Sequence, residues 1–177
     1  MFDTDSEILD IVDEKDLVVG SATRKTIHEN HLIHRAVHVF VFNPNGRIFV
    51  QKRSAHKDRY PLKVDSSAAG HVDPGETYLE AAKRELREEL SISRELTEIL
   101  RVPPSPDTGY EHVVLFQACT DEEPVLNLEE AIGGWFLTPD QLSYAMKTSP
   151  NDFVPAFILL WDKYQGRADE GRDTASP

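Results

Sequence analysis

Residues 70–92 read GHVDPGETYLEAAKRELREELSI, and this stretch contains the clearest helix signal in the chain. Thr77 can cap the start of a helix through its hydroxyl. Glu80, three positions later, can return a hydrogen bond to the Thr77 backbone, which completes a capping box. Apolar residues then recur with helical spacing, which indicates one buried side. The pattern predicts a helix over residues 77–90, with an apolar stripe made of Leu79, Ala82, Leu86 and Leu90.

The same helix carries acidic residues on one side. Glu85, Glu88 and Glu89 are spaced so that they fall within an arc of about 100° at 3.6 residues per turn. Like charges placed in this way repel, at a cost of roughly 0.2–0.5 kcal/mol per pair in an isolated helix. A bound cation would remove that cost. Carboxylate oxygens are hard ligands, so the cluster favours Mg²⁺, Mn²⁺ or Ca²⁺ over zinc.

Strand and turn signals flank this helix on both sides. Residues 36–42 are rich in β-branched and aromatic side chains and predict a buried strand. The turn signal at 43–46 and the alternating segment 47–51 extend that strand into a β-hairpin. The other expected elements are an N-terminal hairpin (8–12 and 17–22), a helical turn (26–31), strands at 99–102, 112–119 and 133–137, and helices from 138 onward and over 154–164.

Interleaved strands and helices in a chain of 177 residues predict a single α/β domain. We expect this domain to span residues 1–165, with residues 1–32 as an N-terminal hairpin extension. Residues 166–177 are small and polar, and they predict a flexible tail.

The composition excludes several classes of protein. Acidic residues outnumber basic ones, 31 to 19, for a formal net charge of -12. This balance argues against binding to a nucleic acid polymer, which needs a basic surface. Cys119 is the only cysteine, so no internal disulfide can form, and a reducing compartment is the simple interpretation. The acidic N-terminus does not resemble a signal peptide, and the apolar runs are too short to cross a bilayer. We expect a cytoplasmic protein that does not associate with membranes.

The spacing of glycine, glutamate and arginine residues within residues 70–92 resembles the Nudix box, the signature of the Nudix hydrolase family. The matching positions are Gly70, Glu76, Arg84, Glu85, Glu88 and Glu89. One position departs from the family pattern, because Ser91 stands where the family has glycine. The resemblance implies a Nudix-type α/β/α sandwich with a mixed sheet. It also implies a metal-dependent attack of water on a diphosphate bond.

The resemblance assigns a role to each matching residue. It implies that Glu85, Glu88 and Glu89 bind metal, assisted by the backbone carbonyl of Gly70. By the same resemblance, Glu76 and Arg84 brace the preceding loop against the helix.

The departure at Ser91 concerns the end of the helix. Serine would lose roughly 1–2 kcal/mol in the left-handed conformation that glycine tolerates, so we expect the helix to end by another route. No metal ligand is lost through this change.

A second resemblance, over roughly residues 7–140, is to isopentenyl-diphosphate isomerase, a Nudix relative that moves a double bond. His34 and His71 match metal-binding histidines of that enzyme, and Glu111 matches the second of its two catalytic glutamates. The first glutamate is replaced by Gly109, and the catalytic cysteine is replaced by Ala69, which cannot exchange a proton. The resemblance therefore implies the isomerase-like subgroup of Nudix hydrolases, with isomerase chemistry lost.

Candidate substrate contacts come from a locally basic segment, residues 52–66. Arg53, Lys57 and Lys63 are predicted to bind phosphate oxygens, since arginine makes bidentate contacts and lysine offers a point charge.

The candidate proton acceptors for the attacking water are Glu88, Glu89 and Glu111. The histidines that neither resemblance addresses are interpreted as structural; they include His28, His31 and His38.

These observations predict a hydrolase that depends on Mg²⁺ or Mn²⁺ and cleaves a diphosphate linkage. The substrate would be a small molecule, either of the nucleoside-diphosphate type or another organic diphosphate. Two alternatives stay open at this point: an isopentenyl-diphosphate isomerase, and a Nudix module that binds a nucleotide without catalysis. The family resemblance also makes a homodimer an expectation.

Overall fold

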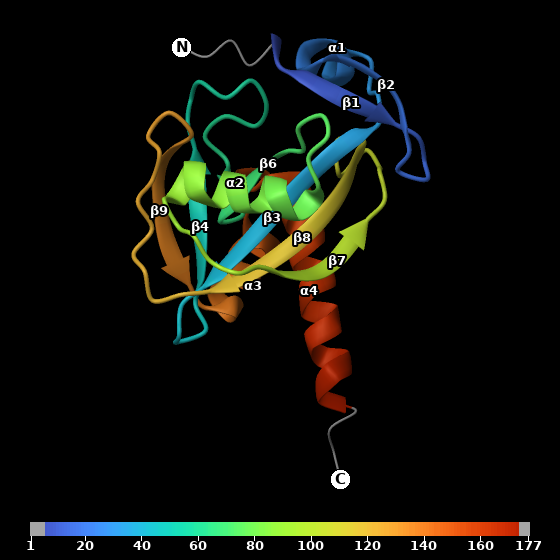
Figure 1. The fold of residues 1–177 in the computed structure, drawn as a ribbon. Helices are drawn as coiled ribbons and strands as arrows, with labels where there is room; N and C mark the ends of the chain where they lie inside the picture. Colours follow the sequence, from blue (N-terminus) through green and yellow to red (C-terminus); the bar gives the residue numbers. More distant parts are fainter. Residues whose placement is uncertain (1–5, 174–177) are drawn as a thin grey trace.

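A computed structural model describes residues 6–173 of the chain (Figure 1). Its elements are β1 (Ile8–Val12), β2 (Val18–Thr23), α1 (Arg24–Glu29), β3 (His34–Phe42), β4 (Ile48–Arg53), β5 (Val64–Asp65), β6 (Ala68–His71), α2 (Tyr78–Leu90), β7 (Thr97–Val102), β8 (Glu111–Cys119), β9 (Ala131–Leu137), α3 (Pro139–Thr148), the 3₁₀ helix η2 (Pro150–Asp152) and α4 (Pro155–Asp173). Within the described residues no helix is both long enough and apolar enough to span a membrane.

A mixed sheet forms the centre of the molecule. Its main path runs β5-β4-β3-β8-β7, while β6 pairs with β3 and β9 pairs with β4. β3 and β8 are parallel, and the other pairs are antiparallel. The predicted hairpin of β3 and β4 is reduced to one residue pair, Phe42 with Ile48. The two strands diverge beyond the turn because β6 takes the place beside β3 and β9 pairs along β4.

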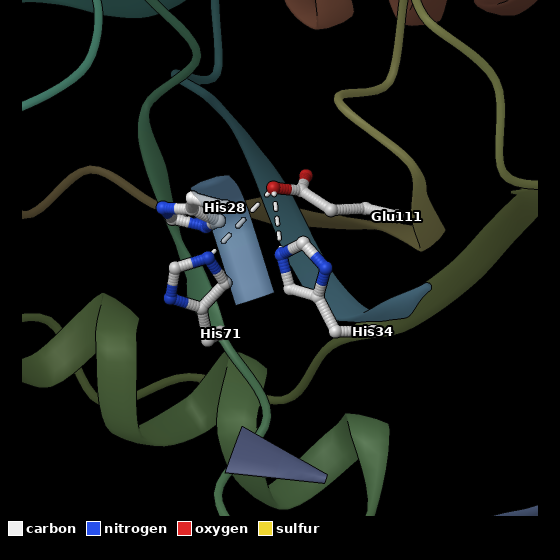
Figure 2. A group of neighbouring side chains, drawn as sticks. All are labelled: His28, His34, His71 and Glu111. Atoms are coloured by element: carbon white, nitrogen blue, oxygen red, sulfur yellow. Dashed lines mark ion pairs between the residues drawn. The ribbon is translucent and has the colours of Figure 1, made fainter. Parts of the chain in front are cut away.

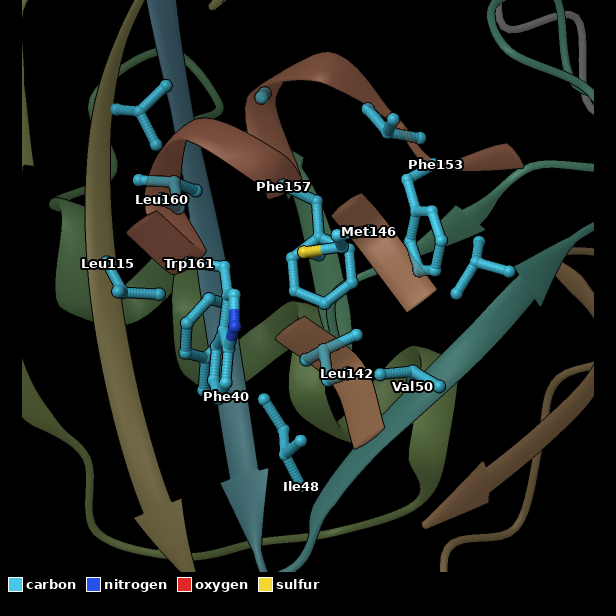
Figure 3. Packing of buried hydrophobic residues seen from close by; sticks show 14 of the residues in the cluster. Phe40, Ile48, Val50, Leu115, Leu142, Met146, Phe153, Phe157, Leu160 and Trp161 are labelled. Carbon is cyan, nitrogen blue, oxygen red and sulfur yellow. The ribbon is translucent and has the colours of Figure 1, made fainter. Parts of the chain in front are cut away.

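Helices cover both faces of this sheet, which confirms the predicted α/β/α sandwich (Figure 1). Alternate residues of β3 supply the two cores, as the two-residue repeat of a strand requires. Val37, Val39 and Val41 pack toward α2, whereas Phe40 packs toward α3 and α4. Figure 3 shows this second core, in which Phe40 lies 5.9 Å from Trp161 between ring centroids.

Helix α2 begins as predicted, because Thr77 and Glu80 form the complete capping box. Its predicted stripe is right except at one end: Ala82, Leu86 and Leu90 are buried, but Leu79 is 41% exposed. Leu79 lies in the first turn, beyond the part of the helix that the sheet covers.

The end of α2 differs from the prediction at Ser91, which adopts the left-handed conformation with φ 57° and ψ 25°. The Ser91 N–H donates to the carbonyl of Arg87, and the Ile92 N–H donates to that of Leu86. Serine therefore takes the route that glycine would take. The buried side chain of Ile92 and the two hydrogen bonds offset the conformational cost.

The N-terminal extension is an antiparallel pair, β1 with β2, followed by the short helix α1. Thr23 caps α1 by accepting a hydrogen bond from the Thr26 N–H. Ile27 anchors the helix with no exposed surface. Figure 1 shows this unit lying over the end of the sheet where β3 begins, so it closes one side of the site described below.

The C-terminal segment also differs from the prediction. Helix α4 continues to Asp173, so the tail expected from residue 166 begins inside a helix, and residues 174–177 lie outside the described part. The flexible tail was expected because residues 166–177 are small and polar. A single glycine such as Gly166, however, costs a helix only about 1 kcal/mol and does not have to end it.

Candidate active site

A cavity of about 280 Å³ is lined by residues of α2, of the segment that follows β4 and of the N-terminal unit. Carboxylates of α2 line one part of its wall, and the remainder combines basic, histidine, acidic and uncharged residues. Four charged residues of α2 belong to this wall: Arg84, Glu85, Glu88 and Glu89. The cavity therefore joins negative and positive groups in one space.

The glutamates of α2 reach the cavity at different depths. Glu89 is only 4% exposed, the Glu85 side chain is 13% exposed and that of Glu88 is 54% exposed. Burial raises the pKa of Glu89, and the neighbouring charge of Glu85 adds to the effect. Burial also raises the pKa of Glu85, although the adjacent Arg84 guanidinium opposes it. The positive charge near Glu85 and Glu89 is therefore too small to offset the effect of burial on their pKa values.

Gln51 of β4 is the direct partner of Glu89. Its side-chain N–H donates to Glu89 Oε2 at 2.5 Å, and its own Oε1 is buried without a partner among the described residues. Sequence analysis did not single out Gln51, because it reads as an ordinary polar position of an alternating strand.

Gly70 lies directly against the carboxylate of Glu85, so a side chain at this position would require that carboxylate to move. A Cβ added there would lie 2.0 Å from Glu85 Oε1. The glycine therefore allows the Glu85 carboxylate to rest against the β6 backbone.

Arg84 connects the loop before α2 to the helix, in the manner the family resemblance implies. Its guanidinium donates to both carboxylate oxygens of Glu76, at 3.0 and 2.9 Å, and to the backbone carbonyl of His71 at 2.9 Å. It also donates to Glu85 Oε1 at 2.6 Å. One arginine therefore fixes the loop and orients one acid of the cavity.

A second cluster lies beside the first and contains His28, His34, His71 and Glu111 (Figure 2). One ligand atom from each residue lies within 4.8 Å of all the others. The three imidazole centroids form a near-equilateral triangle with sides of 5.1, 5.2 and 5.1 Å. Glu111 Oε1 is 3.3 Å from His34 Nε2 and 3.7 Å from His71 Nε2.

Sheet register explains why these residues meet. His34 is paired with Glu111 across the parallel strands β3 and β8, and His71 is paired with Ala36 across β3 and β6. His28 comes from α1, which folds over the start of β3. His28, interpreted as structural from the sequence, thus lies in this cluster. Only the position of α1 over β3 reveals that proximity, and no local pattern in the sequence encodes it.

The hydrogen bonds of the cluster leave ring nitrogens available. His34 Nδ1 bonds to the carbonyl of Leu32 at 2.9 Å, which assigns the proton to Nδ1 and leaves a lone pair on Nε2. His28 Nδ1 faces Asp58 at 3.8 Å. The Nε2 atoms of both rings are buried without a hydrogen-bond partner in the described residues. Buried nitrogens without a partner, in a group whose ligand atoms lie within 4.8 Å of one another, are suited to holding a metal ion.

Electrostatics favour the ligand forms of these groups. Burial lowers the pKa of His71 to about 4, against the opposing effect of Glu111, so its ring is neutral at pH 7. Burial acts to raise the pKa of Glu111, but the neighbouring imidazoles of His34 and His71 outweigh this and hold the pKa well below its ordinary value. Neutral imidazoles and an ionised carboxylate are the states that bind metal.

The donor sets of the two clusters suit different ions. The α2 glutamates offer only oxygen, which fits Mg²⁺ or Mn²⁺, whereas three imidazoles and one carboxylate suit transition metals such as Mn²⁺, Fe²⁺ or Zn²⁺. The residues present thus fit divalent metal at both places.

The basic residues predicted to bind phosphate divide into two groups. Arg53 and Lys57 line the cavity, and Lys57 forms an ion pair with Glu130. Lys63 does not line the cavity. Its ammonium lies near the carbonyl of Phe153 and over the ring of Tyr60, which corrects its predicted position.

Ala69 occupies the cavity wall directly opposite His38 in the β3–β6 pairing. Its methyl group offers no exchangeable proton. His38 is buried, and its Nδ1 lies 2.7 Å from the hydroxyl of Ser66. That nitrogen is thus paired within the fold, although His38 also lines the cavity.

Comparison with known proteins agrees with this geometry. A family model described as the NUDIX domain matches residues 32–157. An uncharacterised Nudix hydrolase of Nostoc sp. is 38% identical over 146 residues, which is 78% of this chain and 84% of the relative. An isopentenyl-diphosphate Delta-isomerase of Photorhabdus laumondii is 35% identical over 70% of this chain and 73% of its own. The crystal structure of DR0079 from Deinococcus radiodurans superposes with a TM-score of 0.72 at 31% identity, covering 80% of this chain and 90% of that one.

Proposed function

This chain belongs to the Nudix hydrolase family, and we propose that it uses the acids of α2 and divalent metal to cleave a diphosphate linkage in a small organic molecule. The substrate is either of the nucleoside-diphosphate type or another organic diphosphate. Mg²⁺ or Mn²⁺ is the proposed cofactor at the glutamates.

The observation that carries this proposal is the charge imbalance in the cavity. Glu85 and Glu89 are enclosed side by side, and burial raises the pKa of both. Arg84 pairs with Glu85, whereas the hydrogen-bond partner of Glu89 is the neutral amide of Gln51. Enclosing a second carboxylate beside the first costs several kcal/mol on general grounds unless a proton or a further cation completes the site. A fold kept only for stability would gain nothing from this arrangement.

Each residue then has a defined task. Glu85 and Glu89 hold the cation, and Gln51 keeps Glu89 in place. When bound, a divalent ion there would neutralise phosphate charge and activate water. Glu88, the accessible acid, or Glu89, the buried one, accepts the proton of that water. Glu111 is less suited to this task because its pKa is held low.

Lys57 lies close enough to the cavity to contact phosphate oxygens. Burial lowers the pKa of its ammonium, while Glu89 opposes the change. Arg53 has a different task, because all three of its guanidinium nitrogens donate to protein acceptors: Asp65 and the carbonyl of Arg59. It shapes the segment after β4.

The histidine cluster is proposed to bind a transition metal ion beside the first site. Replacing His34 with glutamine should weaken the affinity for Co²⁺ or Mn²⁺ at least tenfold, since one of four ligands is lost and the metal geometry with it. Co²⁺ absorption spectra of the wild-type and variant proteins measure this directly. A Glu88→Gln variant, changed outside the cluster, is the control and should keep the Co²⁺ spectrum.

The hydrolytic reaction is tested with a panel of organic diphosphates, in Mg²⁺ or Mn²⁺ and in water enriched in oxygen-18. Incorporation of the isotope into a phosphate product identifies both the substrate and the phosphorus that water attacks. A complete lack of turnover across nucleoside and non-nucleoside diphosphates with either ion would count against hydrolysis.

A second candidate is isomerisation of isopentenyl diphosphate, supported by the histidine cluster and by relatives that carry the isomerase name. Ala69 opposes it, because this position provides no acid or base. Deuterium exchange from heavy water into isopentenyl diphosphate decides between the two, and exchange at an enzymatic rate would favour the isomerase. A purely binding module would instead show thermal stabilisation by a nucleotide with no product formed.

A further inference from the structure

The guanidinium of Arg59 stands in the cavity wall without a hydrogen bond to any described residue. Its nearest carboxylate is Glu111, at 3.8 Å from Nη1, and its side chain is 31% exposed. Other arginines of the wall are committed elsewhere. Arg24 donates to Asp58 at 2.8 Å, and Arg84 donates to Glu76 and Glu85. Arg59 is thus the arginine of this cavity whose guanidinium makes no hydrogen bond within the described residues.

Gly109 is shaped around that guanidinium. Its φ is +70°, a conformation that side-chain-bearing residues rarely adopt, and a Cβ there would lie 2.8 Å from Arg59 Nη2 and 2.9 Å from Nη1. Any other residue would both strain the backbone and displace the guanidinium. The absence of a side chain at Gly109 therefore allows the Arg59 guanidinium to pack directly against the backbone there.

The segment around Arg59 holds it in this position. Arg53 donates through Nε and Nη2 to the Arg59 carbonyl, at 3.3 and 3.1 Å. The ring of Tyr60 lies 5.4 Å from the guanidinium carbon, and Tyr60 itself has φ 51°. Left-handed backbone at a bulky residue is costly and concentrates at functional sites. The fold thus holds a charged fork in the cavity, and its one printed carboxylate partner among the described residues, Glu111, is 3.8 Å away, beyond hydrogen-bond distance.

We propose that Arg59, seated on Gly109, binds an anionic oxygen pair of the diphosphate substrate next to the histidine cluster. This inference rests on the proposed function and names a residue that selects the substrate's phosphate end. A guanidinium fork matches two phosphate oxygens at once, which a lysine cannot do. The competing explanation is that Arg59 only positions Glu111 through its charge.

Calorimetric titration with inorganic pyrophosphate in the presence of Mg²⁺ separates these explanations. Arg59→Gln should weaken pyrophosphate binding about tenfold or more, since a charged hydrogen bond is lost. Arg59→Lys should recover only part of the affinity, because the fork is missing. Arg47→Gln, which removes an exposed arginine in the turn between β3 and β4, is the matched control and should bind like wild type.

Metal affinity provides the second readout. If Arg59 binds the anion, Arg59→Gln leaves the Mn²⁺ affinity unchanged or tighter, because a positive charge near Glu111 has been removed. If Arg59 merely positions Glu111, Mn²⁺ binding weakens while pyrophosphate binding changes only in parallel with it. That second pattern, or wild-type pyrophosphate affinity in Arg59→Gln, overturns the proposal.

Gly109→Ala tests the same contact from the other side. Its added methyl group should lower pyrophosphate affinity in the same direction as Arg59→Gln, with circular dichroism reporting that the fold is kept. Should it unfold, the Arg59 variants alone decide the matter. Failure of all hydrolysis assays would remove the proposed reaction but would leave this binding measurement intact, so the two failures can be told apart.

Discussion

Glu89 combines features that are unfavourable in a metal-free protein: it is enclosed, its nearest charged neighbour on the helix is another carboxylate, and one amide is its hydrogen-bond partner. Gln51 can donate a hydrogen bond but cannot neutralise charge. The energy of this position therefore depends on whether a proton or a cation is bound.

Stability of the metal-free protein should consequently fall as the pH rises above the ordinary carboxyl range. Glu89 has a higher pKa when folded than when unfolded, so between those two values the folded state binds more protons and the free energy of unfolding decreases with pH. Thermal melts in a chelator, from about pH 5 to about pH 8, measure the slope. Glu89→Gln should flatten it, and an identical slope in that variant would contradict the assignment.

Catalysis gives a separate test of the α2 acids. Glu88→Gln and Glu89→Gln should each lower turnover at least about 100-fold, a typical loss when a catalytic acid or base is removed, while the far-ultraviolet circular dichroism stays that of the wild type. Substitution of Glu95, an exposed acid outside the cavity, with glutamine is the matched control. Near-normal turnover in both α2 variants would refute their roles.

Individual site residues were predictable where a motif carried them or where basic residues were concentrated, as for Arg53 and Lys57. His34, His71 and Glu111 came from family resemblance, and the structure brings them together. His28 was interpreted as structural and Arg59 was not selected, because each reaches the cavity through a tertiary arrangement. Lys63 was selected for its charge alone, and it packs against Tyr60 outside the cavity.

At the scale of elements, α2 shows how a local conformational cost is tolerated. Ser91 takes the left-handed conformation usually given to glycine, and the following Ile92 is buried beneath the helix. The cost is local and should therefore be recoverable by substitution.

Ser91→Gly should raise the free energy of unfolding by about 1 kcal/mol, less what glycine loses through its freer unfolded chain. For a domain of this size the melting temperature should rise by about 2–4 °C per kcal/mol. Ser149→Gly at the end of α3 is the matched control, because Ser149 has φ -138° and gains nothing from glycine. A stabilisation equal in both variants, or none in Ser91→Gly, would show that Ser91 is not strained.

Whether a segment forms a helix or a strand was predictable for most of the chain, but the order of the strands in the sheet was not. β-branched and aromatic content indicated β3, two-residue alternation indicated β4, and capping residues located the start of α2. The insertion of β6 beside β3 was not predictable, because strand order depends on contacts between distant segments. The two-residue strand β5 is too short to give any periodic signal.

At the scale of the whole molecule, the histidine cluster connects the N-terminal unit to the sheet. Its four residues come from α1, β3, β6 and β8. A metal bound there would add to the ion pairs that already join these parts, such as Arg35 with Asp16 at 2.6 Å, and anything that binds only the folded state stabilises it.

Hydrogen exchange should therefore reveal a metal-dependent unit within residues 6–33. In a chelator the amides of β1, β2 and α1 should exchange faster than those of β3, and Mn²⁺ or Co²⁺ should slow them about tenfold or more. His28→Ala should abolish this protection without changing exchange in α4. Equal protection with and without metal would mean that the cluster does not hold the N-terminal unit.

Diffraction at the manganese absorption edge, from crystals soaked with Mn²⁺ and methylenediphosphonate, tests most directly whether the acids of α2 hold metal against a diphosphate. We expect anomalous density about 2.0–2.6 Å from carboxylate oxygens of Glu85 and Glu89, with the diphosphonate beside it in the cavity. A diphosphonate bound elsewhere, with no anomalous density at these glutamates, would contradict it.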